Sequence, residues 1–361
     1  GCSYTDGDGT YGMSPENRAG FLPHLQERGV NAPWASSAVL RSFHFDPGDP
    51  ETNELDTSRF DDWVAQWPDA DHFLVFLSVA HYTGTIQTSF GGATLGSPEF
   101  NRKVGVWIKA WVKHLESKGI SPDRLGLLIH DEPHEGSDLG PFLAWARAIK
   151  AAAPEVRIWE DPTYRDPAAA PPDLFEVCDI LCPNRPMWLS QGESFATHYR
   201  AQQKRGKMLQ LYSCSGPVKL LDPYSYYRMQ AWHAWDIGAT GSFFWAFGDH
   251  GGASSWNEYL ARSGPYTPLF LDAKSVTSGK HMEAIRESGQ DYETFVMLRK
   301  AIADGRRTGR EGADLDQAER LLETAVRSVL SAEGVTDLQW KSGKDRGLAD
   351  ERRSTLLDAL E

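Results

Sequence analysis

The chain has 361 residues, enough for one barrel-sized domain with an appendage or for two ordinary domains. Its 37 basic and 50 acidic residues give a formal net charge of −13, which disfavours nucleic acid or an anionic membrane as a partner. No apolar run approaches the roughly 20 residues needed to cross a bilayer, so no membrane span is expected.

Short apolar runs without helical period, bounded by glycine, proline or acids, predict buried strands. In chain order these runs lie near residues 2, 41, 76, 128, 158, 180, 210 and 244. The second run spans 38–45 and the fourth 125–130. Between them, amphipathic segments that begin at capping residues or end at glycine predict helices at 21–29, 56–67, 99–118, 139–152, 194–205 and 224–237.

Eight alternating strand and helix units predict an α/β fold, a closed (β/α)8 TIM barrel. An open doubly wound sheet is the alternative, but no Gly-x-Gly-x-x-Gly follows any of the strands. Beyond about residue 305 the composition shifts to arginine, glutamate, alanine and leucine with helical period, notably over 315–330. We therefore expect a barrel over 1–304 and a helical C-terminal appendix over 305–361.

The four cysteines show neither a Cys-x-x-Cys pair nor a histidine at zinc spacing. Cys178 and Cys182 would lie about 13 Å apart on one strand, beyond disulfide reach. Free thiols are expected. No three side chains have the local spacing of a metal site, and we expect no cofactor.

The fourth predicted strand ends in Asp131 and Glu132, and Pro133 prevents the ladder from continuing. In a parallel barrel the carboxyl ends of all strands meet at one rim, where such enzymes keep their chemistry. Asp-Glu-Pro alone is common, and it is more often a helix cap with solvated acids at a strand end than a catalytic motif. Its place after a buried fourth strand favours a catalytic role for Asp131 and Glu132.

Other polar and aromatic residues fall at the same predicted rim. Acids and rings with few cations suit a neutral polyhydroxylated ligand, and the candidate substrate-binding residues are His44, Tyr82, Trp159, Glu160, Asn184, Tyr212 and Trp245. Small neighbours leave room around Tyr212 and Trp245. For Glu160 a capping role is nearly as good an interpretation, and His44 is of a type more often found in loops or cores. The long patternless loop at 81–98 is of a kind that is usually functional.

Most glycosidases use two carboxyl groups, and many retaining barrels place a nucleophilic glutamate after the seventh strand. Here the seventh strand ends in Leu211-Tyr212-Ser213-Cys214, with no carboxylate. This gap favours a reaction in which the 2-acetamido oxygen of an N-acetylhexosamine attacks its own anomeric carbon. Asp131 would then orient the acetamido N–H, and Glu132 would act as general acid and base.

Three motifs, at 127–133, 227–245 and 283–293, resemble the catalytic region of glycoside hydrolase family 123, the β-N-acetylgalactosaminidases. The resemblance implies that Asp131 orients the acetamido group, that Glu132 is the acid/base, and that Trp245 lies beside the sugar. It implies that the third motif is a structural closing helix. It also implies an amino-sugar-containing glycan as partner and a secreted or periplasmic location.

Two alternatives remain open at this point. One is a glycosidase of different specificity, in which Glu132 works with a second carboxylate such as Glu160 or Asp46. The other is a barrel that binds sugars without catalysis.

Overall fold

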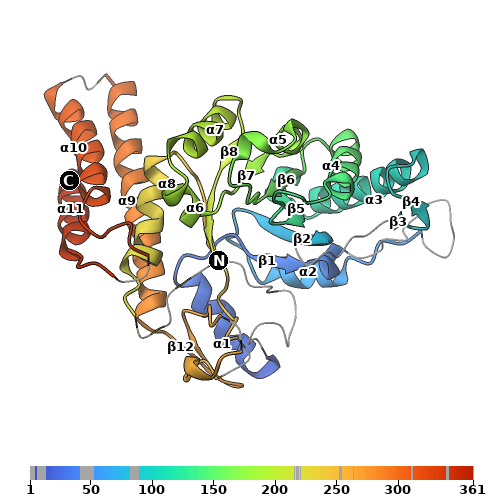
Figure 1. The fold of residues 1–361 in the computed structure, drawn as a ribbon, viewed down its shortest axis with the longest axis horizontal. Coiled ribbons are helices and arrows are strands. Elements are labelled where there is room, and N and C mark those ends of the chain that lie inside the picture. The colour runs from blue at the N-terminus through green and yellow to red at the C-terminus, as the bar shows by residue number, and fades with distance from the viewer. Residues whose placement is uncertain are drawn as a thin grey trace.

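The computed structural model describes Thr5 and residues 14–40, 53–81, 89–214, 216, 219, 221–251, 254–262, 264–309, 312–338 and 341–360. Strands gather at the centre of the molecule, and helices form an arc around them (Figure 1). The first predicted strand, near residue 2, and most of the second lie outside the described residues.

The central strands are parallel and short. Six form one sheet in the order β1-β2-β5-β6-β7-β8, and β9 pairs with β10. Their bounds are β1 Trp34–Ser36, β2 Phe73–His81, β5 Leu125–Asp131, β6 Arg157–Glu160, β7 Ile180–Leu181, β8 Met208–Leu209, β9 Leu211–Ser213 and β10 Ser242–Phe244. A parallel bridge between Asn184 and Tyr212 carries the pairing from the end of β7 to β9. The main-chain N–H of Thr5 donates to the carbonyl oxygen of Trp34 at 2.8 Å, beside β1.

Alternate strand residues divide the core into two layers, as the two-residue period of a strand requires. In β5, Leu127 and Ile129 belong to the large cluster between strands and helices. Leu128 instead belongs to the cluster inside the barrel. The inner cluster consists of Trp34, Leu74, Phe76, Leu128, Trp159, Ile180, Cys182, Tyr212 and Phe243. Large rings thus fill the barrel, as layers of bulky side chains do in this architecture.

Gly126 marks a close approach inside this barrel. A Cβ atom built on it would lie 2.5 Å from Cδ2 of Leu74 on the neighbouring strand β2. A larger residue would therefore force a shift in a closely packed interior.

Helices cover the outside of the strands. Their bounds are α1 Pro15–Gln26, α2 Ser58–Ala65, α3 Pro98–Ser117, α4 Gly140–Ala152, α5 Pro172–Val177, α6 Arg185–Ser190, α7 Glu193–Lys204 and α8 Met229–Asp236. Side-chain caps set several starts: Ser97 accepts from the main-chain N–H of Phe100 at 3.1 Å, and Asn184 accepts from that of Met187 at 3.2 Å. A π-helical segment, η4 Tyr224–Arg228, leads into α8.

The predicted second strand was misplaced. We expected a strand over 38–45, but the strand is β1 Trp34–Ser36, and Ser37–Leu40 forms the 3-10 helix η1; 41–45 lie outside the described residues. Val39 and Leu40 are buried. A short apolar run of this kind does not show by its period whether it forms a strand or a 3-10 helix. The loop predicted at 81–98 contains a small hairpin, β3 Ser89–Phe90 with β4 Ala93–Thr94.

The C-terminal helices α9 Lys280–Arg307, α10 Ala313–Leu330 and α11 Gly347–Asp358 lie together beside α8 (Figure 1). A second apolar cluster joins them to the barrel helices, with Trp232 of α8 and Phe295 of α9 at its centre, 4.7 Å apart between ring centroids. The predicted boundary between residues 304 and 305 falls inside α9. The division into a barrel over 1–304 and an appendix over 305–361 stays a prediction.

Asp291 of α9 has no exposed surface and binds two arginines and a tryptophan. Its carboxylate accepts from Arg228 Nε at 2.9 Å, Trp232 Nε1 at 2.8 Å and Arg353 Nη1 at 3.1 Å. A buried carboxylate needs such partners. Through them the motif 283–293 ties barrel helix α8 to α11.

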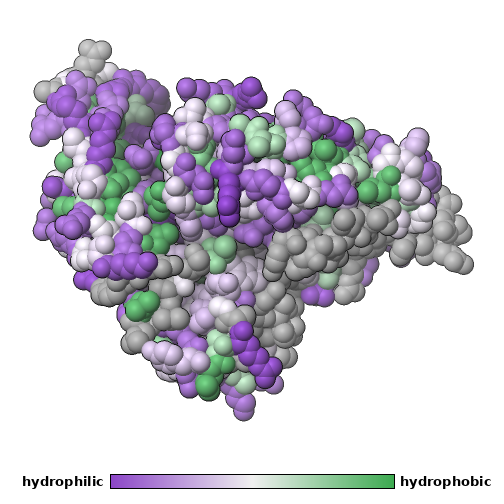
Figure 2. Space-filling model, viewed as in Figure 1, coloured by the Kyte–Doolittle hydropathy of each residue, from purple (hydrophilic) through white to green (hydrophobic). Residues whose placement is uncertain are grey.

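The face shown in Figure 2 is mostly hydrophilic, with hydrophobic residues in small separate groups. In the described part of the chain, no helix combines the length and apolar character that a membrane crossing requires.

Candidate active site

Strand β5 carries Asp131 and Glu132 to the carboxyl end of the barrel. Residues 125–130 are buried, whereas Asp131 and Glu132 are both partly exposed. Glu132 has a φ of +51°, in the left-handed region that few non-glycine residues adopt. The chain therefore turns sharply at this residue, directly before Pro133.

The Glu132 carboxyl group meets the end of the seventh barrel strand. The Tyr212 hydroxyl on β9 donates a short hydrogen bond to Oε1 of Glu132, and the Cys214 thiol lies 3.8 Å from the same oxygen. Burial raises the pKa of Glu132 above its ordinary value, and the charge of Asp131 raises it further. The hydrogen bond from Tyr212 acts in the opposite direction. The net result is a carboxyl group suited to hold a proton, as a general acid must.

Two further acids lie at the end of β6: Glu160 is its last residue, and Asp161 follows it. Asp161 is 5% exposed, and its Oδ1 accepts from the main-chain N–H of Glu132 at 3.0 Å. Burial raises the pKa of Asp161 well above its ordinary value, and the charges of Asp131, Glu160 and Glu132 add to this. For Glu160, burial and the charge of Asp131 likewise raise the pKa. The charges of Asp131, Glu132 and Glu160 thus all act on Asp161 at the ends of β5 and β6.

Glu160 and Trp159 lie beneath the site. Glu160 has no exposed surface and shares its strand face with Ile158, which packs toward the helices. Trp159 is 1% exposed and fills the barrel, where its Nε1 donates to Oε1 of Gln210 at 2.6 Å. In this structure neither side chain offers surface to a ligand, and direct contact with a substrate stays a prediction.

Asn184, Tyr212 and Trp245 stand closer to the rim. Asn184 Nδ2 lies 3.7 Å from the Cys214 sulfur, so Asn184 and Glu132 contact the same thiol. The main-chain N–H of Trp245 donates to the carbonyl oxygen of Ser213, the residue after Tyr212, at 2.9 Å. The Trp245 ring is partly exposed, and its Nε1 donates to Oδ2 of Asp249 at 2.7 Å.

Of the predicted site residues, the structure joins Asp131, Glu132, Asn184 and Tyr212 in one neighbourhood, with the Trp245 main chain adjacent. His44 and Tyr82 lie outside the described residues. Cys214 was not among the predicted site residues, and nothing in its sequence surroundings indicates its contact with Glu132. Asp161 follows a strand directly before a proline, which marks it as a rim residue but does not reveal its bond to Glu132.

The described residues contain no cluster of three or more histidine, cysteine or acidic side chains arranged to hold a metal ion. Cys178, Cys182 and Cys214 are free thiols.

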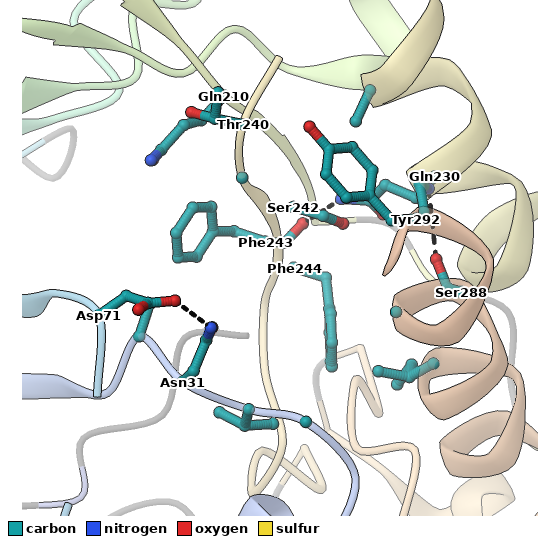
Figure 3. A pocket seen from close by; sticks show the side chains of 18 of the residues that line it. Asn31, Asp71, Gln210, Gln230, Thr240, Ser242, Phe243, Phe244, Ser288 and Tyr292 are labelled. Atoms are coloured by element: carbon teal, nitrogen blue, oxygen red, sulfur yellow. Dashed lines mark hydrogen bonds between the residues drawn. The ribbon is translucent and has the colours of Figure 1, made fainter. Parts of the chain in front are cut away.

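A cavity of about 490 Å³ lies at the opposite end of the barrel. It is lined by residues before β1 and at the starts of β2 and β10, including Asn31, Asp71 and Ser242, together with Tyr292 of α9 (Figure 3). Figure 3 shows Phe243 and Phe244 of β10 between Asn31 and Asp71 on one side and Tyr292 on the other. Since barrel enzymes react at the carboxyl ends of their strands, this cavity is not the candidate active site.

Comparison with solved structures identifies the architecture. The chain is similar to a family 123 glycoside hydrolase from Clostridium perfringens, an enzyme of glycolipid glycan hydrolysis, with a TM-score of 0.58 and 14% identity. The match covers 94% of this chain and 63% of that enzyme. Weaker similarities include a β-galactosidase from Marinomonas ef1 (TM-score 0.49, 9% identity, 87% of this chain and 61% of that one). Another is an exo-β-1,4-mannosidase from Opitutaceae bacterium strain TAV5 (TM-score 0.45, 14% identity, 74% and 54%).

No family model matches the sequence, and no curated protein matches it. The similarity to the Clostridium perfringens enzyme confirms the predicted (β/α)8 TIM-barrel fold, which in this chain is followed by helices. The chain spans a little under two thirds of that enzyme's length.

Proposed function

We propose that this protein is a glycoside hydrolase, a retaining β-N-acetylhexosaminidase that acts on N-acetyl-β-galactosaminides by substrate-assisted catalysis. One observation carries the proposal. At the carboxyl end of β5, Glu132 has a raised pKa and lies beside Asp131, and the residue that reaches it from the seventh barrel strand is Tyr212, not a carboxylate. Among the described residues at this rim, we assign proton transfer to Glu132 and assign no separate nucleophile; Asp46, the other candidate for a second carboxylate, lies outside the described residues.

In the first step the acetamido oxygen attacks the anomeric carbon as the bond to the leaving oxygen breaks, and Glu132 gives its proton to that oxygen. Asp131 accepts a hydrogen bond from the acetamido N–H and stabilises the positive charge of the oxazolinium ion. In the second step Glu132 removes a proton from water, which attacks the anomeric carbon and reopens the ring. Two inversions at one carbon give overall retention.

The similarity to the Clostridium perfringens enzyme supports a glycan as the substrate, since that family 123 enzyme hydrolyses glycolipid glycans. The three sequence motifs support the same family and, with it, an amino-sugar substrate. The arrangement with Glu160 as second catalytic carboxylate is disfavoured, because that side chain has no exposed surface.

The test compares hydrolysis of p-nitrophenyl N-acetyl-β-galactosaminide with that of p-nitrophenyl β-galactoside, which lacks the acetamido group. We expect turnover of the first alone, with retention at the anomeric carbon and inhibition by a thiazoline analogue of the oxazoline. Glu132→Gln should lower kcat/KM by about 10²- to 10⁴-fold, the usual contribution of general acid–base catalysis.

The matched control is Glu155→Gln, because Glu155 is exposed and precedes β6 at the opposite end of the barrel. Its activity should equal that of the wild type. Equal cleavage of both substrates would refute the substrate-assisted mechanism. Sugar binding without turnover would identify a non-catalytic barrel.

A further inference from the structure

Glu132 needs its main chain held in place. Its left-handed φ of +51° is uncommon for a residue with a side chain and carries a free-energy cost. Such a conformation persists only where surrounding contacts fix it. Here it sets the direction in which the Glu132 carboxyl group leaves the strand.

The ladder between β5 and β6 does not supply these contacts. Its last paired residues are Leu128 and Trp159, so it ends several residues before Glu132. Beyond that point, main-chain and side-chain groups of the connection that follows β6, together with His134, contact this part of the chain.

The contacts come from both sides of the residue. Asp161 Oδ1 accepts from the Glu132 N–H at 3.0 Å. The Thr163 hydroxyl lies 3.4 Å from the Glu132 carbonyl oxygen, and the Thr163 N–H donates to the carbonyl oxygen of Pro133 at 2.8 Å. His134 Nδ1 lies 3.0 Å from the same Glu132 oxygen. On the N–H side the partner among the described residues is Asp161, and at 5% exposure its side chain has little freedom to leave.

We infer that Asp161 is a positioning residue for Glu132: its carboxyl oxygen fixes the main chain of the general acid and thereby aims its carboxyl group at the scissile bond. The assignment of Glu132 as general acid rests on the proposed function; the main-chain clamp does not. Asp161 acts through geometry, so what matters is an acceptor oxygen at the right distance, and its charge is secondary.

Two substitutions separate the position of the oxygen from the carboxyl group itself. Asp161→Asn keeps an acceptor oxygen in place and removes the titratable group, whereas Asp161→Glu keeps a carboxyl group and displaces its oxygen by one methylene. We expect Asp161→Asn to retain kcat within about fivefold. Asp161→Glu and Asp161→Ala should lower kcat by about 100-fold with KM little changed, since a misplacement of about 1 Å can cost that much.

The matched control is Asp166→Ala. Asp166 lies in the same connection and also accepts from a main-chain N–H, that of Ala168 at 3.1 Å, but it does not bond to Glu132. Its kcat should remain at the wild-type value. A larger loss of kcat in Asp161→Asn than in Asp161→Glu would overturn the inference, and so would an unchanged kcat in Asp161→Ala.

Hydrogen exchange of peptides spanning 129–134 tests the clamp independently of activity. The Glu132 amide should exchange faster in Asp161→Ala than in Asp161→Asn, while peptides elsewhere remain unchanged. If the wild type cleaves no glycoside, the proposed function fails, and the exchange result still decides whether Asp161 fixes this main chain. Equal exchange in the wild type and both variants would refute the clamp.

Discussion

The hydrogen bond from Tyr212 to Glu132 should set the pH range of activity. The Tyr212 hydroxyl stabilises the charged form of Glu132 and so opposes the rise in pKa caused by burial and by Asp131. In Tyr212→Phe this opposition disappears, and the pKa of Glu132 should rise. Because a general acid works only while protonated, the high-pH limb of kcat/KM should move to higher pH.

The size of this shift follows from the strength of the lost bond. The Tyr212 hydroxyl can bond both forms of Glu132, and a hydrogen bond contributes roughly 1.5–3 kcal/mol to a charged group and roughly 0.5–1.5 kcal/mol to a neutral one. Because one pKa unit corresponds to about 1.36 kcal/mol of difference between the two forms, Tyr212→Phe should move the limb by about one pH unit. The Cys214 thiol also faces Oε1 of Glu132, at 3.8 Å, so Cys214→Ala should move it in the same direction by less.

The assay is kcat/KM for p-nitrophenyl N-acetyl-β-galactosaminide across the stable pH range, which reports groups of the free enzyme. Tyr292→Phe is the matched control, because the Tyr292 hydroxyl donates a single hydrogen bond to Ala239, at 2.9 Å, and does not contact Glu132. An unmoved limb in Tyr212→Phe, or a limb moved to lower pH, would show that this bond does not tune the general acid.

Three further predictions concern stability. Asp291→Ala should lower the free energy of unfolding by about 1–3 kcal/mol, because it removes the acceptor of the buried Trp232 Nε1 and Arg228 Nε, although Glu287 and Asp350 still pair with Arg228. Half-exposed Asp304→Ala should change it little. Gly126→Ala should cost about 1–3 kcal/mol through overpacking inside the barrel, and Gly289→Ala should gain up to about 1 kcal/mol, because that helical position has open space. Glu160→Gln should stabilise the protein more at pH 8 than at pH 5. The folded state retains a proton on Glu160 that the unfolded chain loses above about pH 4.3, so the wild type loses stability as pH rises from there.

Urea titrations at fixed pH measure all of these changes. An Asp291→Ala protein as stable as the wild type would contradict the buried network. A destabilised Gly289→Ala protein would show that the site is more crowded than the structure indicates. A Glu160→Gln effect independent of pH would mean that Glu160 is charged in the folded protein.

The sequence predicts the strand that ends in Asp131 and Glu132 because its apolar run, its acids and Pro133 all indicate the same element. It fails near residue 41, where Pro33 and a three-residue strand leave too short a pattern and a buried 3-10 turn resembles a strand. The barrel follows from the alternation of strands and helices, which requires no exact boundaries.

The contacts around Glu132, in contrast to the strand and the barrel, could not be predicted from the sequence. The bonds from Tyr212 and Asp161 join residues 80 and 29 positions away, and they depend on strand register and side-chain direction. The left-handed φ of Glu132 carries no sequence signal either, because glutamate is not a residue that marks such a conformation. Sequence patterns therefore locate the acids at the rim but do not reveal what holds them.

The network at Asp291 also bears on the order in which the molecule can be assembled during synthesis. The carboxylate on α9 is buried against barrel helix α8, yet one of its two arginines, Arg353, comes from α11. Until the ribosome has released that helix, Arg353 is missing from the network, and the Asp291 carboxylate is left with Arg228 and Trp232. A nascent chain stalled before residue 353 should therefore be more sensitive to protease around α8 and α9 than one stalled beyond α11.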